Sequence, residues 1–291
     1  MIPSLNIVAW SQTTPWTEQR QVEQDLIISR AMVALFSDDF LKSELRFRGG
    51  TALNKLHFPK PLRYSEDIDL VRTTAGPIGP VLTRVREMLN PWLGEPQFVQ
   101  SEIAPKLKYS VEAEDKTSPA PIRLKIEINT RERVAYDTPQ ALPFSVENPW
   151  FTGTADISTF SIEELLSTKV RALLQRNRGR DLIDIAHTLD IFEDFDAATT
   201  VEVLGKYLAA TGISISREEA ERRMFLKLNN PNFMVDVRPL LSADEAEKFD
   251  DNASKTAFVE VFDKIIRLMP GKAWQQTEAM TEKFGLIGLR E

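Results

Sequence analysis

Residues 47–71 read FRGGTALNKLHFPKPLRYSEDIDLV and are the most informative part of this chain. The segment begins as a short apolar strand that ends in Gly49 and Gly50, and it closes with a second strand that carries Asp67 and Asp69. Side chains two positions apart on a strand leave the same face, with their Cα atoms about 6.5–7 Å apart. Both carboxylates are therefore predicted on one face of a sheet, where they form a candidate site for a divalent metal ion.

The two glycines indicate a binding site for phosphate. A strand-to-helix turn without Cβ atoms lets backbone N–H groups approach an anion closely. The helix expected from Thr51 to His57 adds a partial positive charge at its N-terminus. Arg48, Lys55 and Arg63 are nearby cations for a phosphate chain. Alone, a Gly-Gly pair is most often an ordinary turn, and an Asp-x-Asp motif is most often a solvated strand end. Each motif therefore indicates function only in combination with the other.

A third carboxylate comes from a predicted hairpin formed by residues 106–113 and 122–129. Its second strand, RLKIEIN, alternates so that the isoleucines face one side and Glu127 faces the other. In isolation this pattern describes an ordinary half-exposed strand. With two aspartates already on a neighbouring segment, we interpret Glu127 as the third acid of one site.

The ligand chemistry favours Mg²⁺ or Mn²⁺ over zinc. The chain has no cysteine, and its two histidines, His57 and His187, lie too far apart in sequence to suggest a ligand pair. Carboxylate oxygens are the donors that these harder cations prefer. In a two-metal site the ions lie about 3.5–4 Å apart and stabilise the attacking and the leaving oxygens of an in-line displacement.

The second half of the chain contains a lysine in an unusual place. In SIEELLSTKVRALLQRN, Lys169 falls inside the apolar stripe of a predicted helix, where an unpaired ammonium is costly. The next predicted helix, GRDLIDIAHTLDIF, places Asp181 and Asp184 along one side. Structural ion pairs of these aspartates with Lys169 or Arg171 are one explanation, and a lysine stem that extends to solvent at the edge of the core is another.

Residues 135–160 contain three prolines and a glycine without periodicity, and we interpret them as the connection between two lobes. We expect a domain over residues 1–150 and a helical domain over residues 151–291 that completes the active site. The predicted fold class is α+β, with a mixed sheet and flanking helices followed by a helical C-terminal lobe. Other helices are predicted at 14–36 and 80–90, and near 197–210, 216–228, 243–250 and 254–269.

The composition is that of a soluble globular protein, with 42% hydrophobic residues and 27% charged residues. No apolar run approaches membrane-spanning length and the N-terminus lacks a basic leader, so we expect a cytoplasmic protein without a membrane partner. The net charge of −7 argues against a surface coated in basic residues. A nucleic-acid substrate would therefore have to bind in a local basic groove.

Together, these motifs resemble the nucleotidyltransferase fold of polymerase-beta-like enzymes, in which a Gly-Gly or Gly-Ser turn precedes two aspartates and a later strand supplies a third carboxylate. More narrowly, GGTAL followed by RYSEDIDL is similar to the AbiEii/AbiGii family of toxin nucleotidyltransferases, which includes the MenT-type toxins. The second half also matches that family's second signature, E-E-(apolar)2-x-x-K followed by R-D-(apolar)2-D.

The resemblance implies transfer of a nucleoside monophosphate from a nucleoside triphosphate (NTP) to an RNA acceptor, notably the 3′ end of tRNA, which stops translation. It also implies an antitoxin encoded nearby, which in this family can act as a transcriptional repressor without contacting the toxin. The site residues it implies are catalytic Asp67, Asp69, Glu127, Lys169 and Asp184; nucleotide-binding Arg48, Gly49, Gly50, Thr51, Arg63, Ser65, Lys169 and Asp181; and metal-binding Asp67, Asp69 and Glu127. Phosphorylation of Ser65 would place about two negative charges beside the metal ligands, and we expect it to inhibit the enzyme.

Two other functions are compatible with the same residues. A small-molecule nucleotidyltransferase of the aminoglycoside-modifying kind would use the same carboxylates, and the absence of an obvious basic tail is consistent with it. A module that binds nucleoside triphosphates without transferring them would not need all three acids. The motifs do not specify the base or the acceptor.

Overall fold

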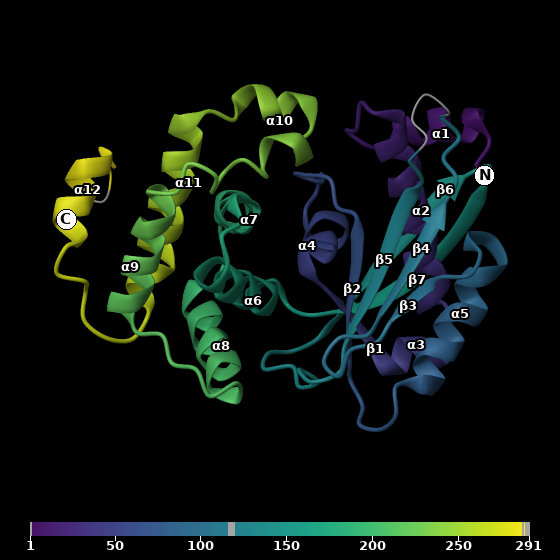
Figure 1. Ribbon diagram of the computed structural model, residues 1–291, viewed down its shortest axis with the longest axis horizontal. Helices are drawn as coiled ribbons and strands as arrows, with labels where there is room; N and C mark the ends of the chain where they lie inside the picture. Colours follow the sequence, from purple (N-terminus) through teal and green to yellow (C-terminus); the bar gives the residue numbers. More distant parts are fainter. Residues whose placement is uncertain (1, 116–119, 287, 289–291) are drawn as a thin grey trace. The chain divides into compact units, whose positions relative to one another are not determined.

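A mixed sheet organises the first half of the chain in the computed structural model, which describes residues 2–115, 120–286 and 288 (Figure 1). Within these residues the sheet has seven strands: β1 (Leu45–Arg48), β2 (Asp67–Arg72), β3 (Gln97–Val99), β4 (Lys106–Val111), β5 (Ile122–Asn129), β6 (Gln140–Asn148) and β7 (Phe151–Thr159). Their order is β3-β4-β5-β2-β1-β7-β6. The pairs β2–β5 and β1–β7 are parallel, and the others are antiparallel.

The apolar face of this sheet forms the core. Leu70 of β2 and both Ile126 and Ile128 of β5 are buried. Helix α2 (Gln19–Phe36) contacts β7, β6, β5 and β2, and α5 (Gly79–Leu93) contacts β4. Because side chains alternate along a strand, burial of this face directs the intervening polar residues of β2 and β5 to the other face.

The N-terminal helices differ in part from the prediction. The helix expected from Thr14 begins only at Gln19, because Trp16 is buried and its indole Nε1 donates to Asp25 Oδ2, which holds residues 15–17 outside the helix. The helix expected from Thr51 is present and begins earlier, at Gly49. The other helical elements of this half are α1 (Ser4–Ser11), α3 (Asp39–Glu44), α4 (Gly49–Ala52) and the π-helix η1 (Leu53–His57).

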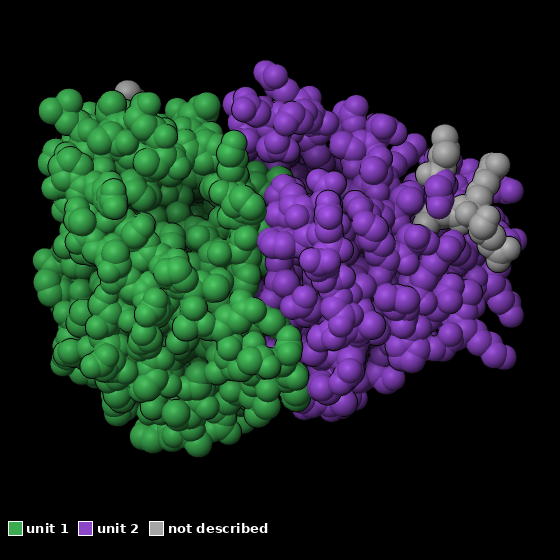
Figure 2. Space-filling model, turned by 180° about the vertical axis from the view of Figure 1, so that it is seen from behind, with its two compact units in different colours: residues 1–161 green, residues 162–291 purple. Residues whose placement is uncertain are grey.

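Residues 135–160 are not a connection between lobes, and that prediction was wrong. They contain β6 and β7, which form a hairpin, and β7 pairs with β1. Pro143 is tolerated inside β6 because this strand lies at the edge of the sheet and pairs only with β7. The chain accordingly divides into a compact unit of residues Met1–Ser161 and a second of residues Ile162–Glu291 (Figure 2).

The second unit is built from helices, as expected for a C-terminal helical lobe. These elements are α6 (Ile162–Gln175), α7 (Gly179–Ile191), α8 (Ala197–Ala210), α9 (Arg217–Leu228), η2 (Arg238–Leu240), α10 (Ala243–Lys248), α11 (Asp251–Lys264), η3 (Ile266–Leu268) and α12 (Thr277–Phe284). Its core includes an aromatic cluster in which Phe225 lies 5.6 Å from Phe258 and 5.3 Å from Phe262 between ring centroids. Across the part of the chain that the structure describes, no helix combines the length and apolarity needed to cross a bilayer.

Candidate active site

A row of four charged residues crosses the polar face of the sheet. Arg48 of β1 is in register with Asp69 of β2, Asp69 with Glu127 of β5, and Glu127 with Lys106 of β4. Residues in register on neighbouring strands send their side chains to the same face with Cβ atoms about 4.5–5.5 Å apart. The sheet therefore brings two of the predicted acids side by side between two cations.

A second row lies two residues away along the strands. Asp67 of β2 is in register with Lys125 of β5, whose Nζ lies 2.9 Å from Asp67 Oδ2 and 3.2 Å from Glu127 Oε2. Lys106 Nζ lies 3.1 Å from Glu127 Oε2 as well. Among the described residues, no three acidic or histidine side chains are already grouped as a metal site. The lysines, and Lys125 above all, are instead the cations that these carboxylates bind.

The glycine turn packs against the same carboxylates. Gly49 has a φ of +84°, and a Cβ atom added to it would lie 2.6 Å from Asp69 Oδ2. No residue other than glycine fits this position without moving the aspartate. The predicted phosphate turn and the predicted metal ligand thus lie in contact, although they are separated by some twenty positions in sequence.

Electrostatics sets the charge state of these acids. Burial raises the pKa of Asp69, and the neighbouring Asp67 carboxylate raises it further. Burial also raises the pKa of Glu127, but the ammonium groups of Lys106 and Lys125 outweigh burial and hold that pKa below its ordinary value. Glu127 is therefore ionised at neutral pH, and a further cation near Asp69 would favour the ionised form of that carboxyl.

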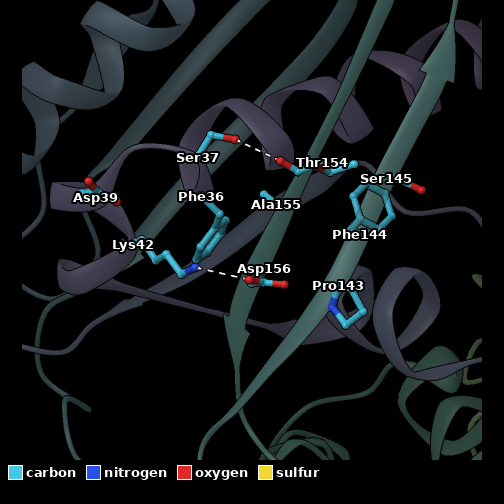
Figure 3. Close-up of a pocket in the computed structure, with 10 residues that line it drawn as sticks. All are labelled: Phe36, Ser37, Asp39, Lys42, Pro143, Phe144, Ser145, Thr154, Ala155 and Asp156. Carbon is cyan, nitrogen blue, oxygen red and sulfur yellow. Dashed lines mark hydrogen bonds and ion pairs between the residues drawn. The ribbon is translucent and has the colours of Figure 1, made fainter.

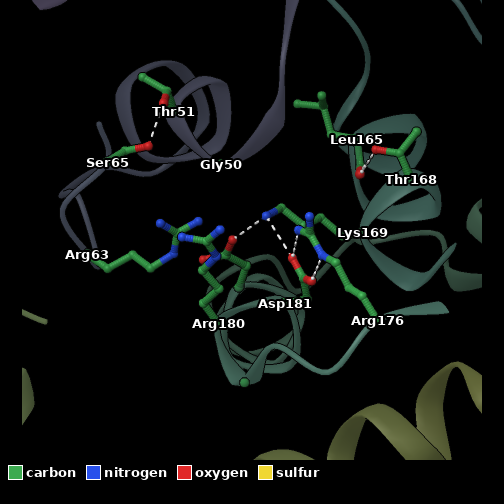
Figure 4. A network of polar contacts seen from close by, with 12 residues as sticks. Gly50, Thr51, Arg63, Ser65, Leu165, Thr168, Lys169, Arg176, Arg180 and Asp181 are labelled. Carbon is green, nitrogen blue, oxygen red and sulfur yellow. Dashed lines mark hydrogen bonds and ion pairs between the residues drawn. The ribbon is translucent and has the colours of Figure 1, made fainter. Parts of the chain in front are cut away.

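Thr51 and Ser65 hold the turn to the strand. The hydroxyls of these two residues are hydrogen-bonded to each other (Figure 4). Thr51 Oγ1 also donates to the carbonyl of Asp67. Asn54 Nδ2 donates to the carbonyl of Gly50 at 2.9 Å. These bonds connect α4 and η1 to the first residue of β2, so they fix the glycine turn beside the aspartates.

The basic residues near the turn already have partners in the protein. Arg48 Nη1 lies 2.5 Å from Glu132 Oε2. Arg63 is buried, and its Nη1 donates to the carbonyl of Tyr64 at 3.1 Å. Lys55 Nζ donates to Asp25 Oδ2 at 2.8 Å, and we assign it to the fold because Asp25 also binds two tryptophan indoles. Nucleotide binding by Arg48 and Arg63 stays a prediction.

The second signature forms a buried charge cluster in the helical unit. Lys169 Nζ of α6 lies 2.8 Å from Asp184 Oδ2 and 3.2 Å from Asp181 Oδ1, both on α7. Arg176 donates twice to Asp181, at 2.7 and 2.8 Å (Figure 4). The side chains of both aspartates are fully buried and that of Lys169 is 8% exposed. These contacts are the structural ion pairs that the sequence offered as one explanation for a lysine within the apolar stripe of a helix.

Two lysines were not singled out from the sequence. Lys106 and Lys125 bind Glu127 and Asp67, yet only their position on the polar face of two predicted strands pointed to them. The alternation of RLKIEIN places Lys125 on the same face as Glu127, which was the available signal. Their pairing with particular acids depends on strand register, which that alternation does not give.

A cavity of about 730 Å³ lies elsewhere in the first unit (Figure 3). Its lining includes the exposed Lys42–Asp156 ion pair of 3.8 Å and a 3.4 Å bond from Ser37 Oγ to the carbonyl of Thr154. None of the predicted site residues is among the residues that line it. We therefore place the candidate active site at the charged rows of the sheet.

The residues present at these rows fit a divalent cation. Asp67, Asp69 and Glu127 supply hard oxygen donors, and two of them already bind the ammonium of Lys125. Carboxylates of this kind suit Mg²⁺ or Mn²⁺. Gly49 packs closely against Asp69 and has no side chain, so main-chain atoms lie beside the acids. A phosphate group could therefore approach the backbone there.

Comparison with known proteins assigns the fold and the family. Residues 30–260 match the family model described as nucleotidyl transferase AbiEii toxin, Type IV TA system. The fold is similar to that of MenT4, a nucleotidyltransferase toxin from Mycobacterium tuberculosis H37Rv, with a TM-score of 0.60 and 14% identity over 99% of each chain. It is also similar to JHP933 from Helicobacter pylori, with a TM-score of 0.50 and 14% identity over 93% of this chain and 98% of that one. Among curated proteins, none matches this chain.

Proposed function

The chain belongs to the AbiEii family of nucleotidyl transferase toxins of type IV toxin–antitoxin systems, and on this basis we propose that it transfers a nucleoside monophosphate from an NTP to the 3′ end of tRNA. This modification would block translation. The proposal includes Mg²⁺ or Mn²⁺ as cofactor and an antitoxin encoded nearby. Its main support is that Asp69 lies in register with Glu127. Asp67 is on the same face of β2, and the Gly49 turn packs against Asp69.

The transfer requires one new bond and one broken bond. The acceptor hydroxyl oxygen bonds to the α-phosphorus, and the bond from that phosphorus to the bridging oxygen breaks, so that pyrophosphate leaves with the electron pair. Ionised Glu127 is suited to accept the hydroxyl proton or to help hold the metal, and Asp67 and Asp69 would be the other metal ligands. A bound divalent ion would neutralise charge on the triphosphate and on the leaving group.

The remaining cations of the site support a polyanionic substrate. Lys106 and Lys125 lie on the same face of β4 and β5, in contact with the carboxylates. They place positive charge beside the carboxylates in a chain whose net charge is −7. We extend the proposal to Lys169 and Asp184 of the helical unit, which the family signature places among the catalytic residues.

The test is transfer of label from each α-labelled NTP to tRNA, with Mg²⁺ or Mn²⁺ present. Asp67→Asn removes one carboxylate charge, and its half-exposed position leaves Lys125 paired with Glu127, so the fold should persist. We expect label at the tRNA 3′ end with the wild type, and a rate lower by at least about hundredfold in Asp67→Asn. Expression of the wild type should arrest growth and expression of Asp67→Asn should not.

Glu66→Gln is the matched control, because it makes the same chemical change one position away at an exposed side chain. It should transfer label and arrest growth as the wild type does. Transfer to an aminoglycoside in place of tRNA would replace the acceptor in this proposal. An Asp67→Asn protein that labels tRNA at the wild-type rate would exclude the site altogether.

A further inference from the structure

Lys125 occupies the position where a cation is bound by two of the proposed metal ligands. Its ammonium lies 2.9 Å from Asp67 Oδ2 and 3.2 Å from Glu127 Oε2, so it bridges carboxylates on two different strands. Strand register sets this position, since Lys125 faces Asp67 across β2–β5 and precedes Glu127 by two residues on the same face. Small shifts of nearby loops would therefore not remove the bridge.

Lys125 supplies one of the two ammonium groups that contact the carboxylates of this face. Asp67, Asp69 and Glu127 bring three negative charges, and Lys125 and Lys106 bring two positive ones in direct contact with Asp67 and Glu127. A divalent ion bound to the same oxygens would bring two further positive charges close to the ammonium. Like charges this near repel strongly in a partly desolvated site.

Lys125 is able to leave. Its side chain is 29% exposed, and a lysine carries its charge on a flexible four-carbon stem, so the ammonium can swing to solvent without disturbing the strand. The cost of leaving is the loss of two ion pairs, which the metal replaces for both carboxylates.

We propose that Lys125 is a positioning residue that holds Asp67 and Glu127 together in the metal-free protein and is displaced when the divalent metal ion binds. The inference rests on the proposed function, because it takes these carboxylates as metal ligands. It adds a residue that sets how tightly the metal binds before any nucleotide or acceptor is present.

The experiment measures Mn²⁺ binding by electron paramagnetic resonance together with thermal unfolding, without nucleotide, in full-length protein. In Lys125→Gln the metal no longer displaces an ammonium, so we expect its Kd for Mn²⁺ to fall about tenfold below that of the wild type. The metal-free variant should melt a few degrees lower than the wild type, because its carboxylates repel each other, and saturating Mn²⁺ should abolish that difference. Lys125→Arg should restore a Kd close to the wild-type value.

Lys108→Gln is the matched control. Lys108 is exposed and lies on β4 in register with Lys125, and its substitution removes the same charge. Its Kd for Mn²⁺ should stay within about twofold of the wild type, because among the described residues Lys108 forms no ion pair with Asp67 or Glu127. Mn²⁺ binding in Lys125→Gln that is equal to or weaker than in the wild type would overturn the inference and leave the proposed function standing. Absence of Mn²⁺ binding in the wild type as well as the variants would overturn both, and Asp67→Asn should abolish binding if the ligands are correct.

Discussion

Gly49 is the residue at which backbone conformation and site chemistry meet. Its φ of +84° is unfavourable for any side chain, and the added Cβ of an alanine would contact the Asp69 carboxylate. We expect Gly49→Ala to lower the free energy of unfolding by about 2–4 kcal/mol, from strain and overpacking together. Transfer activity should fall further than stability alone explains, because Asp69 must move. Urea unfolding and the tRNA labelling assay measure the two effects.

Gly212 provides the comparison for Gly49, since its φ is +70° and an added Cβ would meet no atom within 4 Å. Gly212→Ala should therefore cost only the strain, about 1 kcal/mol, with transfer unchanged. Equal losses of stability in the two variants would contradict the role given to the contact between Gly49 and Asp69.

His57, in the π-helix that follows the glycine turn, predicts a pH-dependent stability. Burial lowers its pKa from 6.5 to about 4, and among the described residues its buried Nε2 has no hydrogen-bond partner. Between pH 6.5 and 4 the unfolded chain binds a proton at His57 that the native protein does not, so the free energy of unfolding falls as the pH falls through this window. We expect this histidine to contribute about 3 kcal/mol to that fall.

The measurement is urea unfolding of the wild type and of His57→Gln at several values of pH between 7 and 4. Other carboxyl groups titrate in both proteins, so only the difference between the two curves reports on His57. That difference should be constant above pH 7 and should change progressively toward pH 4. Parallel curves over the whole range would show that His57 is solvated in the native protein.

At the scale of secondary structure elements, helices α6 and α7 are held together by charge as well as by their apolar stripes. Lys169 is buried against Asp184 and Asp181, so its removal leaves a buried carboxylate without its cation. We expect Lys169→Met to cost about 3–5 kcal/mol of unfolding free energy. Loss of activity in a Lys169 variant therefore has to be interpreted beside its stability.

A double-mutant cycle with Asp184→Asn separates the ion pair from the packing. The double variant Lys169→Met/Asp184→Asn should lose less stability than the sum of the single variants, by at least about 1 kcal/mol, because no unpaired charge remains at position 184. Urea unfolding of the four proteins gives the coupling energy. Strictly additive losses would mean that the 2.8 Å contact contributes nothing to the fold.

Helices of the second unit were easier to predict than strands β6 and β7. Helices α8, α9, α10 and α11 begin after Asp196, Ser216, Ser242 and Asp250, whose side chains accept hydrogen bonds from the first turns. Such caps are local, so a single sequence contains them. Strands β6 and β7 are stabilised by pairing with each other and with β1, and their prolines and polar residues concealed that pairing.

At the scale of the whole molecule, the chain forms two compact units, one with the sheet and one of helices, which carry different parts of the family signature. The glycine turn and the three predicted metal ligands belong to the first, and Lys169, Asp181 and Asp184 belong to the second. The α+β fold and the resemblance to AbiEii toxins, both inferred from the motifs, are confirmed by the family match and by the fold of MenT4. The residue roles and the tRNA acceptor stay predictions.

The amino-acid sequence by itself determined the family, the glycine turn, and the faces of the strands that carry Asp67, Asp69 and Glu127. These follow from local spacing, because alternation fixes which side chains share a face of one strand. Only the tertiary structure decided that Asp69 lies in register with Glu127 and that Lys125 bridges Asp67 and Glu127. Register between strands far apart in the chain is set by the packing of the whole sheet, and a shift of one residue would have turned these side chains to the other face.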